Sequence, residues 1–142
     1  MNTSYFDLYD NLTELKEDEL SWFLQICEFC KAATGIYIPI ECEDHSVRSG
    51  KSKEALGILH TDNPNTPLNG DTFITIDSLF IHECYEEVFE QKLNLSFENL
   101  EHVIAHEFAH CYQWRHCKKH AKITEEIYQK IKKYQELNPE KL

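Results

Sequence analysis

The sequence His106-Glu107-Phe108-Ala109-His110 is the feature that most restricts what this chain of 142 residues can fold into. It lies on a segment whose apolar residues recur at helical spacing. Residues four apart share one face of an α-helix, so the two imidazoles can meet at one tetrahedral metal ion. Glu107 lies about 100° further round the helix, where it can reach a water on that metal without being a ligand. The pattern therefore predicts a helix that carries half of a zinc site together with a general base.

A third zinc ligand must follow this helix, because a catalytic zinc ion usually has three protein ligands and one open position. His116 has the spacing of the metzincin motif, but Gln113 replaces the glycine that lets such a chain turn. A left-handed conformation costs a non-glycine residue about 1 kcal/mol, and residues 112–114 are interpreted as continued helix. His120 is therefore favoured, because a loop before the last helix lets it approach from the far side. The remaining alternatives are the carboxylates of Glu125 and Glu126.

The rest of the chain alternates between helical and strand periodicity. Helices are expected over residues 17–33 and 83–93, from residue 96 through the zinc motif, and from residue 124 onward. Short strands are expected over residues 36–40, 55–60 and 72–77. This order is typical of an α+β domain with a small mixed or antiparallel sheet and flanking helices. We expect a single domain over residues 1–142, with residues 1–15 as an N-terminal arm.

The composition restricts the environment and the partners of the chain. Twenty-five acidic against fourteen basic residues give a net charge of −11, which argues against autonomous binding to nucleic-acid phosphates. The N-terminus has no basic region followed by an apolar run, and no stretch of about 18 apolar residues follows. We expect a cytoplasmic protein without a membrane span, whose six cysteines stay reduced. Cys27 and Cys30 are interpreted as a buried pair in the first helix. The oligomeric state stays undetermined.

A family resemblance is carried by Val103-Ile104-Ala105-His106-Glu107-Phe108-Ala109-His110, by Trp114-Arg115-His116 and by His120. Through these residues the chain resembles the SprT-like family of zinc metallopeptidases, over residues 15–135. In that family a later histidine, usually followed by glycine, completes the zinc site. On this chain the resemblance implies His120, although Ala121 replaces the glycine. It also implies a zincin-like fold.

The function expected from these residues is hydrolysis of peptide bonds in protein or peptide substrates. Zn²⁺ would be held by His106, His110 and His120, and Glu107 would be the general base. The strand over residues 72–77 is expected to be the sheet edge on which a peptide aligns. One alternative is a non-catalytic zinc-binding module in which a fourth ligand such as Cys117 closes the site. Another is a regulatory protease dedicated to one partner protein, with the same residue assignments.

Overall fold

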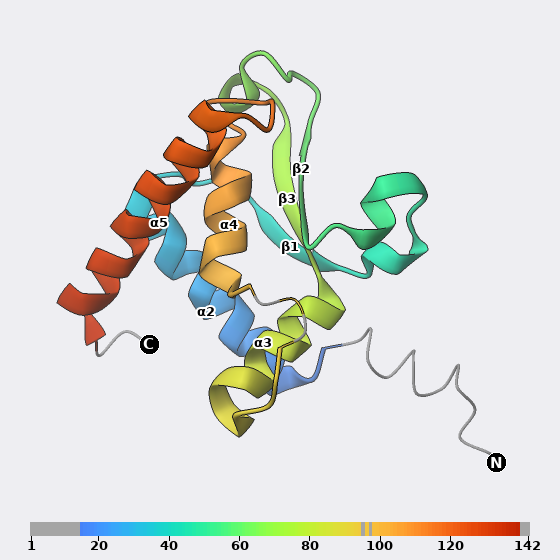
Figure 1. Ribbon diagram of the computed structural model, residues 1–142, viewed down its shortest axis with the longest axis vertical. Coiled ribbons are helices and arrows are strands. Elements are labelled where there is room, and N and C mark those ends of the chain that lie inside the picture. The colour runs from blue at the N-terminus through green and yellow to red at the C-terminus, as the bar shows by residue number, and fades with distance from the viewer. Residues whose placement is uncertain (1–14, 95, 97, 140–142) are drawn as a thin grey trace.

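The computed structural model describes residues 15–94, 96 and 98–139 of the chain. These residues form four α-helices and a three-stranded sheet (Figure 1), which confirms the α+β class. The helices are α2 (Glu17–Thr34), α3 (Ser78–Glu90), α4 (Leu100–Ala109) and α5 (Lys118–Leu137). The strands are β1 (Ile40–Glu43), β2 (Gly57–Thr61) and β3 (Thr72–Asp77). Apart from Leu15, the expected N-terminal arm lies outside the described residues.

The sheet is mixed, with the strand order β1-β3-β2. β1 runs parallel to β3 and β2 runs antiparallel to it, so that Ile40 and Leu59 both lie opposite Ile74. The expectation that residues 72–77 form the substrate-binding edge is wrong, because β3 is the central strand and is paired on both sides. The sheet edge that lies beside α4 belongs to β2.

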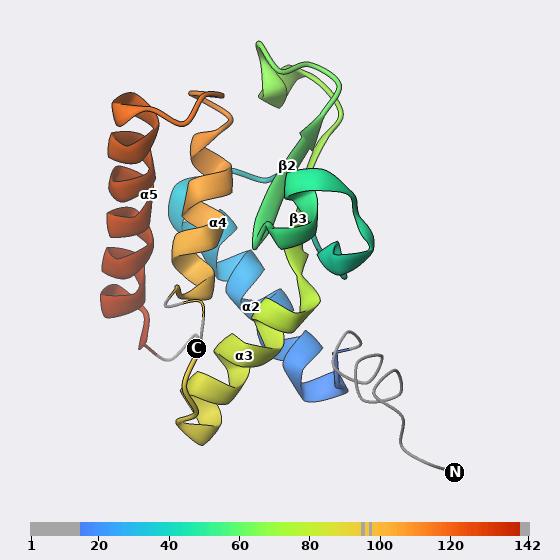
Figure 2. The same ribbon diagram turned by 45° about the vertical axis from the view of Figure 1, so that its right-hand side comes forward.

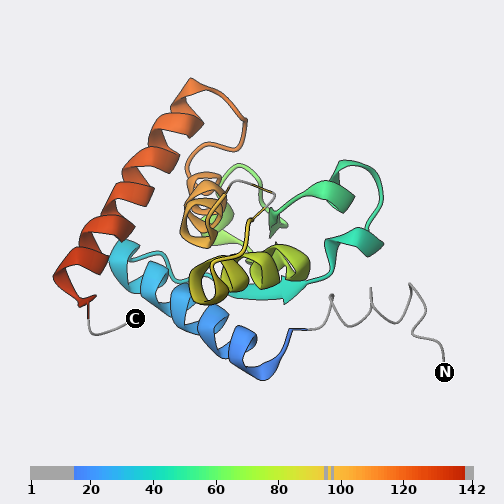
Figure 3. The same ribbon diagram turned by 60° about the horizontal axis from the view of Figure 1, so that its bottom comes forward.

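Helix α4 lies at the centre of the domain. It packs between α5 and strand β2, with α2 against a further side (Figures 1 and 3). Ile104, Ala105 and Phe108 of α4 are completely buried. Their partners in the core come from the other helices and the sheet: Phe23, Ile40, Ile74, Ile76, Phe80, Ile81 and Ile131. A helix that is buried on most sides holds its remaining polar face in a fixed position.

The first strand begins later than the predicted residues 36–40. The carbonyl oxygen of Pro39 accepts a hydrogen bond from the N–H of Ile74 at 2.8 Å, but proline has no N–H to return. Regular pairing with β3 therefore starts at Ile40.

Helices α3 and α4 both begin where an acceptor side chain caps them. Asp77 accepts hydrogen bonds from the N–H of Phe80 at 3.3 Å and from the N–H of His45 at 3.0 Å. Helix α3 therefore starts at Ser78 rather than at residue 83. Asn99 caps α4 by accepting from the N–H of His102 at 2.8 Å, so α4 starts at residue 100 rather than at 96.

Two further expectations can be compared with the described residues. Among them, no helix has the length and the apolar content that a membrane crossing requires. All six cysteines are free, and Cys27 and Cys30 are buried in α2 as predicted.

Replacing Asp77 should separate its capping role from its charge. We predict that Asp77→Ala lowers the free energy of unfolding by about 1–2 kcal/mol, because the N–H groups of Phe80 and His45 lose their acceptor. Asp77→Asn keeps an acceptor oxygen and should lose less. Urea unfolding followed by circular dichroism measures both, and equal losses in the two variants would contradict the capping role.

Candidate metal centre

A tight turn at the end of α4 brings the predicted site residues together. The N–H of Cys111 donates to the carbonyl of Phe108 at 3.0 Å, and the N–H of Gln113 donates to that of Ala109 at 2.9 Å. The prediction of continued helix over residues 112–114 is wrong, because these bonds close the last turn and the chain then leaves the helix axis. Gln113 has a negative φ, so the return of the chain does not require glycine at this position.

Helix α5 begins earlier than predicted and carries His120 in its first turn. It starts at Lys118 rather than at Thr124, so His120 does not lie in a loop. Figure 2 shows α5 running beside α4, which brings the start of α5 to the end of α4. The ring of His120 is buried, and its Nε2–H donates to the carbonyl oxygen of His106 at 3.0 Å.

Four imidazoles meet in this region, and we call them the histidine cluster: His106, His110, His116 and His120. Three of them, His106, His110 and His120, each offer a ligand nitrogen within 4.8 Å of the others and could hold a metal ion. The Nε2 atom of His116 lies 3.2 Å from Nε2 of His106 and 3.0 Å from Nε2 of His110. Both histidines considered as the third ligand therefore lie in the cluster. Glu125 and Glu126 are exposed on α5 and are not part of it.

The ring positions distinguish His116 from His120. Three imidazoles on one tetrahedral ion, with metal–nitrogen distances of about 2.0–2.1 Å, have ring centres about 5 Å apart. The ring centres of His106, His110 and His116 lie 5.0, 5.1 and 4.7 Å apart. His120 instead stacks on His110, with ring centres 4.1 Å apart and planes inclined by 26°. Lone pairs in the planes of two stacked rings converge poorly on one ion.

The histidine cluster keeps two of its imidazoles neutral. Burial, reinforced by the neighbouring His120, lowers the pKa of both His106 and His110 to about 4. Nδ1 of His110 lies 3.2 Å from the carbonyl oxygen of Gln113 and donates its proton there, which leaves the lone pair on Nε2. A neutral imidazole whose other nitrogen donates to a carbonyl is the form that binds metals.

Glu107 is buried between the histidine cluster and the sheet edge. It is 5% exposed, and its Oε2 atom lies 3.9 Å from Nε2 of His106. Burial raises the pKa of Glu107 to about 8, although the N–H of Leu59 donates to the carboxylate and opposes this shift. A Cβ atom at Gly57 would lie 3.0 Å from Cγ of Glu107 and 3.0 Å from Cγ1 of Val103. The sequence did not reveal the roles of Gly57 and Leu59, because the close contact between β2 and α4 is not marked by a motif in either segment.

Strand β2 and helix α4 enclose a cleft of about 750 Å³, which we call the active cleft. One wall is formed by residues 55–59 and the other by the face of α4 that carries His106, Glu107 and His110. Residues 114–116 line it after the turn. Cys117 lies outside it, exposed, in a smaller recess that His116 and His120 also line.

Comparisons with known proteins return no relative: no family model, curated protein or solved structure matches the chain.

A side chain at residue 57 should disturb the packing of Glu107. We predict that Gly57→Ala lowers the free energy of unfolding by about 1–3 kcal/mol, because the added Cβ meets Glu107 and Val103 at 3.0 Å. Adding Val103→Ala makes room, so the double variant should lose less than the two single losses combined. Strictly additive losses in urea unfolding would contradict this steric account.

The raised pKa of Glu107 predicts a pH dependence in protein freed of metal. The carboxyl ionises near pH 4.5 when unfolded and near pH 8 when folded, so its contribution to stability is complete below pH 4.5 and is lost as the pH rises to 8. We predict that Glu107→Gln gains stability over the wild type across this range, by up to about 1.4 kcal/mol per pH unit. Urea unfolding in chelator at pH 5 and pH 8 measures the difference. A difference that does not change with pH would show that Glu107 ionises normally.

Proposed function

We propose that this chain is a zinc-dependent metallopeptidase with a zincin-like fold, as the resemblance to the SprT-like family implies. The observation that supports this most directly is the convergence of His106, His110 and His116 through Nε2 atoms beside the buried carboxylate of Glu107. The group opens into a cleft whose other wall is the edge strand β2. A peptide, which carries its own unpaired N–H and C=O groups, can be placed along such an edge.

The ligand set that fits the distances best is His106, His110 and His116. The two separations from Nε2 of His116, 3.2 Å to Nε2 of His106 and 3.0 Å to Nε2 of His110, approach the separation of about 3.3 Å expected on a tetrahedral zinc ion. His120, the third ligand expected from the sequence, would then act as a positioning residue. Its hydrogen bond to the carbonyl of His106 and its stacking on His110 hold two ligands in place.

Zinc fits these ligands, because neutral imidazoles suit zinc and three of them leave a fourth position open. When bound, zinc would lower the pKa of a water molecule toward neutrality and polarise the carbonyl of the peptide bond. Its positive charge would also favour the ionised form of Glu107, opposing the effect of burial.

Glu107 would carry the proton during hydrolysis. Its carboxylate accepts a proton from the attacking water while the C–O bond forms, and it returns this proton to the amine nitrogen as the C–N bond breaks. The N–H of Leu59 fixes the carboxylate by donating to it. The absence of a side chain at Gly57 lets α4 approach β2 closely enough for that contact.

Strand β2 would bind the peptide through its outer edge. The carbonyl of Leu56 accepts from the N–H of Asp77 in β3, and the N–H of Asp62 donates to the carbonyl of Asp71, just before β3. Because backbone groups alternate between the two sides of an antiparallel strand, those of Gly57 and Thr61 face the open edge. This edge, rather than β3, replaces the expected substrate-binding strand.

A closed zinc site without catalytic activity is the second candidate, and the position of His120 is the observation that favours it. If His120 joined the other three histidines as a ligand, the ion would have four protein ligands and no open position. A regulatory protease dedicated to one partner protein would use the same residues as the proposed peptidase.

The catalytic role is tested by Glu107→Gln, with Glu126→Gln as the matched control on exposed α5. We predict that Glu107→Gln keeps one zinc ion per chain but loses at least about 100-fold in cleavage of an unfolded protein such as casein. Glu126→Gln should keep both. Zinc content is measured by atomic emission, and full activity in Glu107→Gln would refute the proposed role.

The ligand set is tested by comparing His116→Ala with His120→Ala. We predict that His116→Ala loses stoichiometric zinc, because a ligand is removed. His120→Ala should keep zinc with an affinity weakened about 10- to 100-fold, as expected for a residue that orients ligands. Competition with a fluorescent chelator measures both affinities, and the reverse order would make His120 the third ligand.

A further inference from the structure

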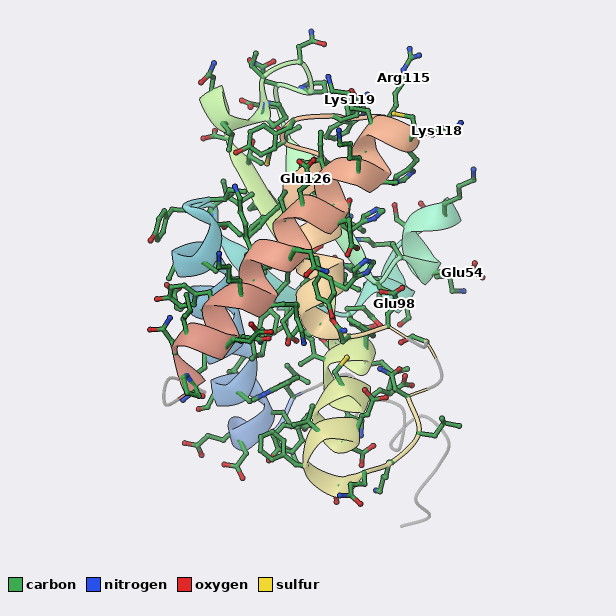
Figure 4. The ribbon with its side chains drawn as sticks, turned by 60° about the vertical axis from the view of Figure 1, so that its left-hand side comes forward. Glu54, Glu98, Arg115, Lys118, Lys119 and Glu126 are labelled. Atoms are coloured by element: carbon green, nitrogen blue, oxygen red, sulfur yellow. The ribbon has the colours of Figure 1, made fainter. Side chains whose placement is uncertain are left out.

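The active cleft has side chains of opposite charge at its two ends. Glu98 lines it just before α4 begins, and Arg115 lines it just after the turn that follows α4. His106 and Glu107 lie between them along the helix. In Figure 4, Glu98 lies toward one end of α4, and Arg115, Lys118 and Lys119 gather toward the other.

These charges are available to a ligand. Within the described part of the chain, no acidic group lies within 4.0 Å of the charged atoms of Arg115, Lys118 or Lys119. The carboxylate of Glu98 has a partner in His102: its Oε2 atom lies 2.7 Å from Nδ1 of His102, and the side chain of Glu98 remains 38% exposed. A basic end is notable on a chain with a net charge of −11, because most of its surface repels acidic ligands.

The distance between the two ends corresponds to a short peptide. Helix α4 has 10 residues and is therefore about 15 Å long at about 1.5 Å per residue, with Glu98 before its first residue and Arg115 beyond the turn that follows its last. An extended peptide rises about 3.3 Å per residue, so this length spans about four to five residues. A peptide lying along α4 would pass Glu107 near the Arg115 end and reach both charged ends with side chains on either side of the bond to be cleaved.

The direction of such a peptide follows from the direction of β2. Residue 57 lies against Val103 and Glu107, while the N–H of Leu59 reaches Glu107, and Figure 1 shows β2 and α4 running the same way. The start of β2 therefore lies toward Glu98 and its end toward Arg115. A peptide that pairs antiparallel, the more stable arrangement per residue, has its N-terminal part at the Arg115 end.

Resting on the proposed function, we propose that the active cleft selects peptide segments with an acidic side chain before the cleaved bond and a basic side chain after it, about four to five residues apart. Arg115, supported by Lys118 and Lys119, would contact the acidic side chain. Glu98 would contact the basic one. This assigns the cleft a preference for a charge order in unfolded segments, rather than for one amino acid at the cleaved bond.

The preference is tested by binding rather than by cleavage, so that it can fail separately from the proposed function. Zinc-loaded Glu107→Gln protein is titrated with two fluorescent peptides of identical composition. In the acidic-first peptide the acidic residue lies N-terminal to the basic one, and in the basic-first peptide the order is reversed. We expect the acidic-first peptide to bind at least about five-fold more tightly than the basic-first peptide at low salt. The ratio of the two affinities should fall toward one at 0.5 M NaCl. Equal affinity of the two peptides would overturn the inference, whether or not the wild type cleaves protein.

Variants with reversed charges then test whether Arg115 and Glu98 cause this preference. In the Glu107→Gln background, Arg115→Glu with Glu98→Lys should reverse the order of affinities, because both ends change sign. Lys133→Glu with Glu126→Lys makes the same exchange on exposed positions of α5, and should leave the ratio unchanged. An unchanged ratio in the first pair of substitutions would contradict the assignment. If the ratio behaves as expected but wild-type protein cleaves nothing, the cleft selects these peptides and the proposed hydrolysis is wrong.

Discussion

The close contact between α4 and the edge strand β2 is the constraint on which the rest of the site depends. It exists because residue 57 has no side chain, so Glu107 and Val103 can occupy the space beside the strand. At that distance the N–H of Leu59 reaches the carboxylate, which is held between sheet and helix rather than turned to solvent. The same contact makes β2 one wall of the active cleft, so the proposed general base and the candidate substrate edge are fixed together.

Burial then determines the charge state of the site in the absence of metal. It lowers the pKa of His106 and His110 and raises that of Glu107, so all three are uncharged near pH 7. Neutral imidazoles are what a metal ion requires, and a cation in their midst would restore the charge of the carboxylate. The hydrogen bonds of His110 to Gln113 and of His120 to His106 orient the rings before any ion is present.

The sequence predicts those features of the fold that are local. Alternation located β3 correctly, and helical periodicity identified α2 and the helix of the zinc motif. It could not predict that β3 is central, since pairing partners lie far apart in the chain. Helix ends were misjudged where Asp77 and Asn99 act as caps and where α4 closes at Ala109. That last error matters most for the site, because a turn without glycine brings His116 back to His106 and His110.

The central claim is that three histidines hold a zinc ion beside Glu107 and leave one position open. The most direct measurement is a crystal structure of the zinc-loaded protein, with the ion located by anomalous scattering at the zinc edge. The account predicts one ion bound by Nε2 of His106, His110 and His116 at about 2.0–2.1 Å, with its fourth position open to the active cleft. An ion enclosed by four protein ligands, or density elsewhere than in the histidine cluster, would contradict it.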